Sequence, residues 1–129
     1  MLGYEDAKYI DLESGEVIFR EGEIGEDIYI IAKGSVRIYL EREDGEVHLD
    51  SLRIGDFFGE MILFEENERS ASAVALEPTR LIVIKKDNFE EEIEKKPWLA
   101  RKMLRSLMER LRHCNEQISN LNHELDKRS

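Results

Sequence analysis

Four residues within a short stretch combine side chains that could hold a phosphate and a sugar hydroxyl at once: Gly59, Glu60, Arg69 and Ser70. Gly59 lets the backbone approach a ligand closely. The turn over residues 60–63 has free N–H groups at its start, which could bind an anion. Arg69 offers a planar, permanently charged fork that suits a phosphate, and Ser70 adds a hydroxyl donor.

Glu60 is the unexpected member of this group, because a carboxylate beside a phosphate site would repel the ligand. Its presence makes sense if it accepts hydrogen bonds from a ribose hydroxyl and also pairs with Arg69. A ligand that presents both a phosphate and a ribose hydroxyl is a nucleotide. The alternative is a surface role, in which Arg69 pairs with glutamates of residues 65–68 and contributes little, while Glu60 is only a charge at a helix start.

The chain of 129 residues has room for one domain, and no segment approaches the roughly 18 apolar residues of a membrane span. Residues 1–11 lack a signal-peptide pattern, and the single cysteine, Cys114, cannot form an internal disulfide. We therefore expect a cytoplasmic, soluble protein with no membrane partner. Its net charge of -10 also disfavours nucleic-acid partners, since acidic surfaces repel phosphates.

Residues 14–86 predict short strands that are separated by glycine-containing turns. The expected strands cover residues 16–20, 27–31, 35–41, 47–52, 70–76 and 80–85. Val36, Ile38 and Leu40 alternate with Arg37 and Tyr39, the period of a half-buried strand. Asp44-Gly45 predicts a hairpin between two strands. A turn about every ten residues favours a β-sandwich, jelly roll or small barrel.

The pattern changes to helix after this β-rich region. Asp87 and Asn88 predict an N-cap, and the short helix behind them should stop near Lys96 because Pro97 follows. Residues 98–125 contain no Gly or Pro and predict one long helix. We therefore expect a β body over residues 1–96 and a C-terminal helix over residues 97–129, both in the same domain.

Apolar residues on the long helix step by three and four positions over three heptads, the a/d pattern of a coiled coil. This seam consists of Leu104, Leu107, Leu111, Cys114, Ile118, Leu121 and Leu125. It could pack on the protein's own β body or on a second copy of the chain. Because it runs roughly 30 Å, longer than a small barrel can cover, we expect a homodimer through residues 104–125. Leu99 and Met103 lie beside the seam and could pack on the β body.

Three ordered stretches carry a family resemblance: residues 22–36 (GEIGEDIYIIAKGSV), 54–60 (IGDFFGE) and 63–71 (LFEENERSA). They resemble cyclic nucleotide-binding domains, specifically the ligand domain of the bacterial cyclic AMP receptor protein family, over residues 12–120. The resemblance implies an eight-stranded jelly-roll β-barrel with flanking helices, followed by a long C-terminal dimerisation helix. It also implies a regulatory module that binds cAMP or cGMP, with no enzyme activity, cofactor or metal.

The resemblance implies a role for each residue of the phosphate-binding cassette. Glu60 resembles the carboxylate that binds the ribose 2′-hydroxyl. Arg69 resembles the arginine that pairs with the cyclic phosphate, and Ser70 resembles the adjacent hydroxyl donor. Backbone contacts would come from Gly59, Met61 and Ala71.

On the long helix, Arg110 falls where the family has an arginine that links helix and pocket. Cys114 falls where the bacterial receptor has a threonine that reads the base, and Asn115 where the partner subunit contributes a polar side chain. Cys114 is a poor hydrogen-bonding residue, so Asn115 could read the base edge instead. Ile62 stands where a small residue is usual. The chain stops at Ser129 without the receptors' helix-turn-helix domain, so DNA binding by this chain alone is not expected.

Three functions compete for this sequence. The first is a dimeric cyclic nucleotide sensor that signals through its C-terminal helix, on which an unidentified partner protein could dock. The second is a jelly-roll enzyme of the cupin kind, which needs several converging histidines, whereas the barrel region has only His48. The third is an interaction or scaffold protein that keeps the fold without the ligand, which the changed residue at Cys114 would favour.

Overall fold

The computed structural model describes residues 8–63 and 68–128, apart from the side chains of Met61 and residues 123–128. The strands are β1 (Lys8–Leu12), β2 (Val17–Phe19), β3 (Asp27–Lys33), β4 (Ser35–Arg42), β5 (Gly45–Arg53), β6 (Phe57–Phe58), β7 (Ser72–Ala75) and β8 (Thr79–Lys85). The helices are the 3₁₀ helices η1 (Glu60–Leu63) and η2 (Lys86–Asn88), and the α-helices α1 (Phe89–Lys95) and α2 (Pro97–Arg128).

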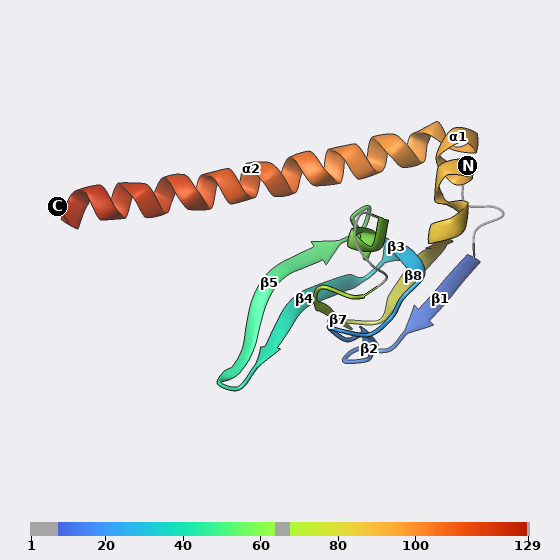
Figure 1. Cartoon of the computed structure of the whole chain (residues 1–129), viewed down its shortest axis with the longest axis horizontal. Coiled ribbons are helices and arrows are strands. Elements are labelled where there is room, and N and C mark those ends of the chain that lie inside the picture. The colour runs from blue at the N-terminus through green and yellow to red at the C-terminus, as the bar shows by residue number, and fades with distance from the viewer. Residues whose placement is uncertain (1–7, 64–67, 129) are drawn as a thin grey trace.

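The strands form two four-stranded antiparallel sheets, in the orders β1-β8-β3-β6 and β2-β7-β4-β5 (Figure 1). All six predicted strands are present. The sequence did not predict β1, whose KYIDL stretch carries two charges, or β6, whose two residues are too few to show a period. The structure thus confirms a mainly β protein with flanking helices. Closure of the sheets into the eight-stranded jelly-roll barrel stays a prediction.

The predicted hairpin joins β4 and β5, with Arg42 opposite Gly45. The pairing register shifts between Ile38 and Tyr39, which leaves Leu49 as an extra residue in β5. The predicted alternation along β4 is wrong at Tyr39, whose side chain is only 3% exposed. The Arg37 guanidinium covers part of this ring at 5.0 Å from its centroid, so β4 buries residues on both faces.

Buried apolar side chains form two clusters. The first joins residues of both sheets, including Phe19, Tyr29 and Phe58. The second packs Leu99 of α2 against Ile30 and Phe57, with Met103 beside it. The predicted contacts of Leu99 and Met103 with the β body are therefore confirmed, and they fix the first turns of α2 on the body.

The short helix stops where predicted, with Lys96 as its C-cap, and Pro97 is the first residue of α2. Proline is well tolerated there because the first N–H of a helix has no intrahelical partner. Asn88 stands at the N-cap of α1 as predicted, but its side chain makes no capping hydrogen bond. Its backbone angles, φ -100° and ψ 0°, continue from η2, so the chain is already turning before α1 begins.

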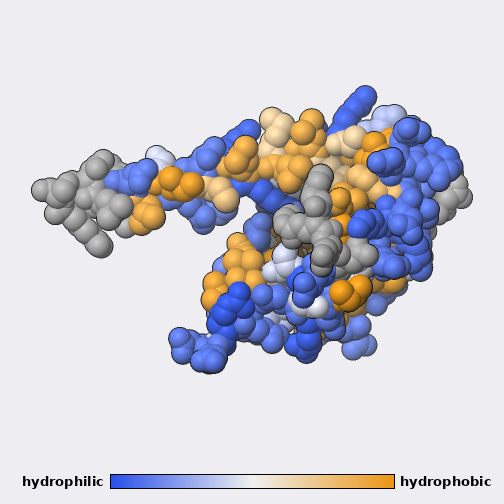
Figure 2. Space-filling view, viewed as in Figure 1, coloured by the Kyte–Doolittle hydropathy of each residue, from blue (hydrophilic) through white to orange (hydrophobic). Residues whose placement is uncertain are grey.

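Helix α2 runs beside the β body and then extends beyond it, with apolar patches along its surface (Figures 1 and 2). The described leucine and isoleucine side chains of the seam are 47–62% exposed, and Cys114 is also exposed. Packing of the seam on the chain's own β body is therefore excluded for these residues. Leu125 lies outside the described side chains, and pairing with a second copy stays a prediction. No described helix is both long enough and apolar enough to cross a membrane.

Candidate functional site

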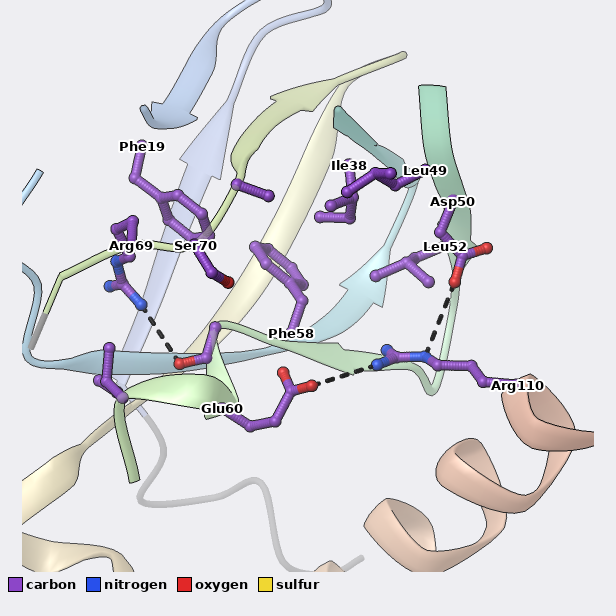
Figure 3. A pocket seen from close by; sticks show the side chains of 13 residues that line it. Phe19, Ile38, Leu49, Asp50, Leu52, Phe58, Glu60, Arg69, Ser70 and Arg110 are labelled. Carbon is purple, nitrogen blue, oxygen red and sulfur yellow. Dashed lines mark hydrogen bonds and ion pairs between the residues drawn. The ribbon is translucent and has the colours of Figure 1, made fainter. Parts of the chain in front are cut away.

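A cavity of about 250 Å³ opens between the two sheets, η1 and α2 (Figure 3). Its walls bring together residues that lie up to 91 positions apart in the sequence. The lining residues are Phe19, Ile38, Leu49, Asp50, Leu52, Phe58, Gly59, Glu60, Ile62, Arg69, Ser70, Ala71 and Arg110. Six of the nine predicted site residues are in this set: Gly59, Glu60, Arg69, Ser70, Ala71 and Arg110.

Gly59 follows β6 and turns the chain into η1. Its φ of 82° is a backbone conformation that residues other than glycine rarely adopt. A Cβ on this residue would lie 2.9 Å from Arg69 Nη1 and 3.3 Å from the Asp27 carbonyl oxygen. The Arg69 guanidinium therefore approaches the Gly59 backbone closely, whereas the approach of a ligand to this backbone stays a prediction.

Arg69 is almost fully buried, with 5% of its surface exposed. Its Nη2 donates to the Asp27 carbonyl at 2.9 Å and its Nη1 to the Gly59 carbonyl at 3.3 Å, while Nε has no hydrogen-bond partner among the described residues. The guanidinium lies over the Phe19 ring at 4.2 Å from its centroid. Burial lowers the pKa of Arg69, and the neighbouring Tyr29 opposes this shift, yet arginine keeps its charge.

The predicted ion pair between Glu60 and Arg69 is wrong. Arg69 is 5% exposed and makes no ion pair within the described part of the chain, so the alternative of a surface pair with Glu68 is wrong; Glu65 and Glu66 lie outside the described residues. The Glu60 carboxylate points instead toward α2, where its Oε1 lies 3.5 Å from Arg110 Nη1 (Figure 3). Arg69 is drawn away from Glu60 because two backbone carbonyls offer it acceptors beside Gly59.

Arg110 links α2 to the cavity, as the resemblance implied. Its Nη2 donates to the Phe57 carbonyl, its Nη1 faces Glu60, and its Nε lies 4.0 Å from Asp50 Oδ2. One turn earlier, Ser106 Oγ donates to Asp56 Oδ1 at 3.1 Å. The contacts of Arg110 with the Phe57 carbonyl and of Ser106 with Asp56 connect α2 to β6, the strand that leads into η1.

Ser70 and Ala71 lie on the cavity wall immediately after Arg69, Ser70 exposed and Ala71 buried. Met61 belongs to η1, but its side chain lies outside the described set. Ile62 is 1% exposed and lines the cavity, so the large residue at this position is accommodated by burial.

Cys114 and Asn115 do not line this cavity. Cys114 lies on a second cavity of about 590 Å³ between β5 and α2, which shares Leu49, Asp50, Leu52 and Arg110 with the first. Asn115 is exposed and lines neither cavity. In a single chain, the two residues predicted to read a base are therefore separate from the residues that would hold a phosphate.

Sequence reasoning missed the apolar wall and one carboxylate of the site. The missed residues are Phe19, Ile38, Leu49, Asp50, Leu52 and Phe58, most of them on strands that are far apart in the sequence. The sequence shows that the strands are apolar, but it does not show which of their residues line the same cavity. Among the described residues, no three His, Cys, Asp or Glu side chains gather as they would around a metal ion.

The family model of the cyclic nucleotide-binding domain matches residues 9–96. The chain belongs to this family. The chain is 36% identical over 111 residues to the cyclic AMP receptor protein of Thermus thermophilus, a match that covers 85% of this chain and 51% of the relative. It spans about half the length of the cyclic AMP receptor proteins that it matches.

Solved structures agree with this assignment. The catabolite activator protein of Thermus thermophilus superposes with a TM-score of 0.71 at 33% identity, over 93% of this chain and 57% of that one. The EAL enzyme Bd1971 in its cGMP-bound form gives a TM-score of 0.63 at 36% identity, over 88% and 30% of the two chains. The cavity described above therefore lies in a cyclic nucleotide-binding domain, and two of its charged residues, Glu60 and Arg69, come from the stretches that carried the resemblance.

Proposed function

We propose that this cyclic nucleotide-binding domain binds cAMP or cGMP in the cavity between η1, β5 and α2. The observation that carries this proposal is the state of Arg69. The Arg69 guanidinium is 5% exposed, makes no ion pair among the described residues, and donates its hydrogen bonds there to two backbone carbonyls while its Nε stays unpartnered, so it is a buried positive charge without a paired carboxylate in the described part of the chain. Such a charge is costly unless it is compensated, and a cyclic phosphate supplies one negative charge and several acceptor oxygens.

The remaining roles follow from the positions of the polar groups around Arg69. Ser70, exposed on the cavity wall beside it, would donate its hydroxyl to the same phosphate. Glu60 would accept a hydrogen bond from the ribose 2′-hydroxyl, and Arg110, 3.5 Å away, would keep its carboxylate oriented. Backbone contacts would come from Gly59, Met61 and Ala71.

The test is isothermal titration calorimetry of the full chain with cAMP, cGMP and cyclic dinucleotides. Arg69→Ala should weaken binding roughly a hundredfold or more, because each charge-assisted hydrogen bond contributes about 1.5–3 kcal/mol. Arg80→Ala is the matched control, since Arg80 pairs with Asp11 on the surface and does not line the cavity. Absence of binding to all ligands at millimolar concentration, with the chain folded, would contradict the proposal and favour a ligand-free interaction or scaffold protein.

We also propose that α2 pairs with a second copy through residues 104–125, and that ligand binding shifts the balance of the dimer toward one arrangement. The exposed leucines of α2 and its extension beyond the β body support this pairing. Leu111→Glu, at a position that is 62% exposed, should give a monomer by multi-angle light scattering without loss of folded structure. A dimer of unchanged stability in this variant would exclude the seam as the interface.

A further inference from the structure

One carboxylate of the cavity has no role in the proposed function. Asp50 lies on β5 next to the extra residue Leu49, and it lines both the first and the second cavity. Its side chain is 38% exposed, so part of the carboxylate is open to a ligand.

The acceptor capacity of Asp50 is only partly used. Its Oδ1 accepts a hydrogen bond from the Ser51 N–H at 2.9 Å. Its Oδ2 lies 4.0 Å from Arg110 Nε, which is longer than a hydrogen bond. The other donors of Arg110 are directed elsewhere, to the Phe57 carbonyl and to Glu60. The carboxylate therefore keeps free lone pairs beside the cavity.

The polar groups of the cavity follow one another in a defined order. Arg69 contacts the backbone of Gly59, the neighbouring Glu60 side chain points away from it to Arg110, and Arg110 reaches Asp50 (Figure 3). If the phosphate lies at Arg69 and the ribose at Glu60, as proposed above, the base lies between β5 and α2, where Asp50 is.

We propose that Asp50 determines the base specificity of this domain by accepting two hydrogen bonds from guanine; this inference rests on the proposed function. Guanine presents two adjacent donors, N1–H and the 2-amino group, that match the two oxygens of a carboxylate. Adenine presents one donor, the 6-amino group, next to the N1 lone pair, which would face the second carboxylate oxygen. A carboxylate at this place therefore favours cGMP over cAMP.

The residues at the positions predicted to read the base do not compete with Asp50 in a single chain. Cys114 is exposed and is a weak hydrogen-bonding group, and Asn115 lines neither cavity. Asp50 is the carboxylate that lines both cavities among the described residues. The cation Arg110 lines both as well, but its Nη1 and Nη2 already face Glu60 and the Phe57 carbonyl.

The experiment is calorimetric titration of the full chain with cGMP, cAMP and cyclic IMP, which keeps the N1–H of guanine but lacks the 2-amino group. The wild-type chain should bind cGMP about tenfold to a hundredfold more tightly than cAMP, with cyclic IMP between them. Asp50→Asn should abolish this preference, because an asparagine amide offers one acceptor and one donor and so no longer matches the two adjacent donors of guanine, whereas it can pair with the 6-amino group and N1 of adenine. Asp44→Asn, in the β4–β5 turn and away from the cavity, is the matched control and should keep the wild-type ratio.

Equal or tighter binding of cAMP by the wild-type chain would overturn the inference and leave the proposed function intact. The same holds if Asp50→Asn, shown to be folded by circular dichroism, keeps the wild-type ratio. If the folded wild-type chain binds none of the three nucleotides, the proposed function fails and the inference falls with it.

Discussion

The two ends of the cavity are built from different kinds of structure. At the end formed by η1, backbone carbonyls and the positive φ of Gly59 hold Arg69, and the guanidinium is buried. At the end formed by β5 and α2, the polar groups are side chains that remain partly exposed, and Arg110 is the cation between them. The first end thus depends on local backbone geometry, whereas the second depends on how α2 docks on the β body.

The largest effect on the α2 end should come from Arg110→Ala. This change leaves the Phe57 carbonyl without its donor and separates Glu60 and Asp50 from their cation. The free energy of unfolding should fall by about 2 kcal/mol, because a lost charged hydrogen bond costs about 1.5–3 kcal/mol. Urea denaturation measures this, with Arg112→Ala on the exposed face of α2 as the control. Equal stability of the two variants would mean that Arg110 does not anchor the helix.

The η1 end can be disturbed without removing its arginine. A Cβ on Gly25 would overlap Nε and Cζ of Arg69, and the φ of Gly25 is not in the positive region. Gly25→Ala should therefore displace the guanidinium, the movable partner, and spare the fold. We expect cyclic nucleotide affinity to fall about tenfold, or about 1.4 kcal/mol, by calorimetry.

A double-mutant cycle separates this mechanism from a general loss of structure. In the Arg69→Ala background, Gly25→Ala should cause no further loss of affinity, because the side chain with which it collides is absent. Additive losses in the double variant would show that Gly25 acts on the site by another route.

The same contrast explains what the sequence could and could not predict. The six predicted strands, the hairpin at Asp44-Gly45 and the end of α1 before Pro97 follow from local chemistry, and the structure confirms them. The sequence also assigned Gly59 and Arg69 to one site, and the structure brings them together, although their direct contact was not predicted. The ion pair of Glu60 with Arg110 could not be predicted, because Arg110 is 50 positions away and reaches Glu60 only after α2 has docked on the β body. Asp50 was missed for the same reason, since it meets Arg110 across 60 positions of sequence and belongs to no motif.

A smaller effect on the α2 end is expected from Ser106→Ala. Ser106 is 3% exposed, and its hydroxyl donates to Asp56 one turn before Arg110. Loss of this buried hydrogen bond should reduce the free energy of unfolding by about 1 kcal/mol. Thermal denaturation of Ser106→Ala, Arg110→Ala and the double variant would show whether the contacts of Ser106 and Arg110 are energetically coupled. Strict additivity would mean that each contact holds α2 independently.

The smallest effect should come from Cys114→Ala, at an exposed position of α2 that faces the second cavity. In the monomeric Leu111→Glu background, this change should alter stability by no more than about 0.5 kcal/mol, as is usual for exposed positions. Nucleotide affinity should also stay within about twofold there, because Cys114 does not line the cavity that contains Arg69 and Glu60. Calorimetry measures the nucleotide affinity of this monomeric variant. A clear loss of affinity would show that the base extends past Asp50 into the second cavity, so that Cys114 belongs to the binding site. An effect seen only in the dimer would instead place Cys114 at the contact between the two helices.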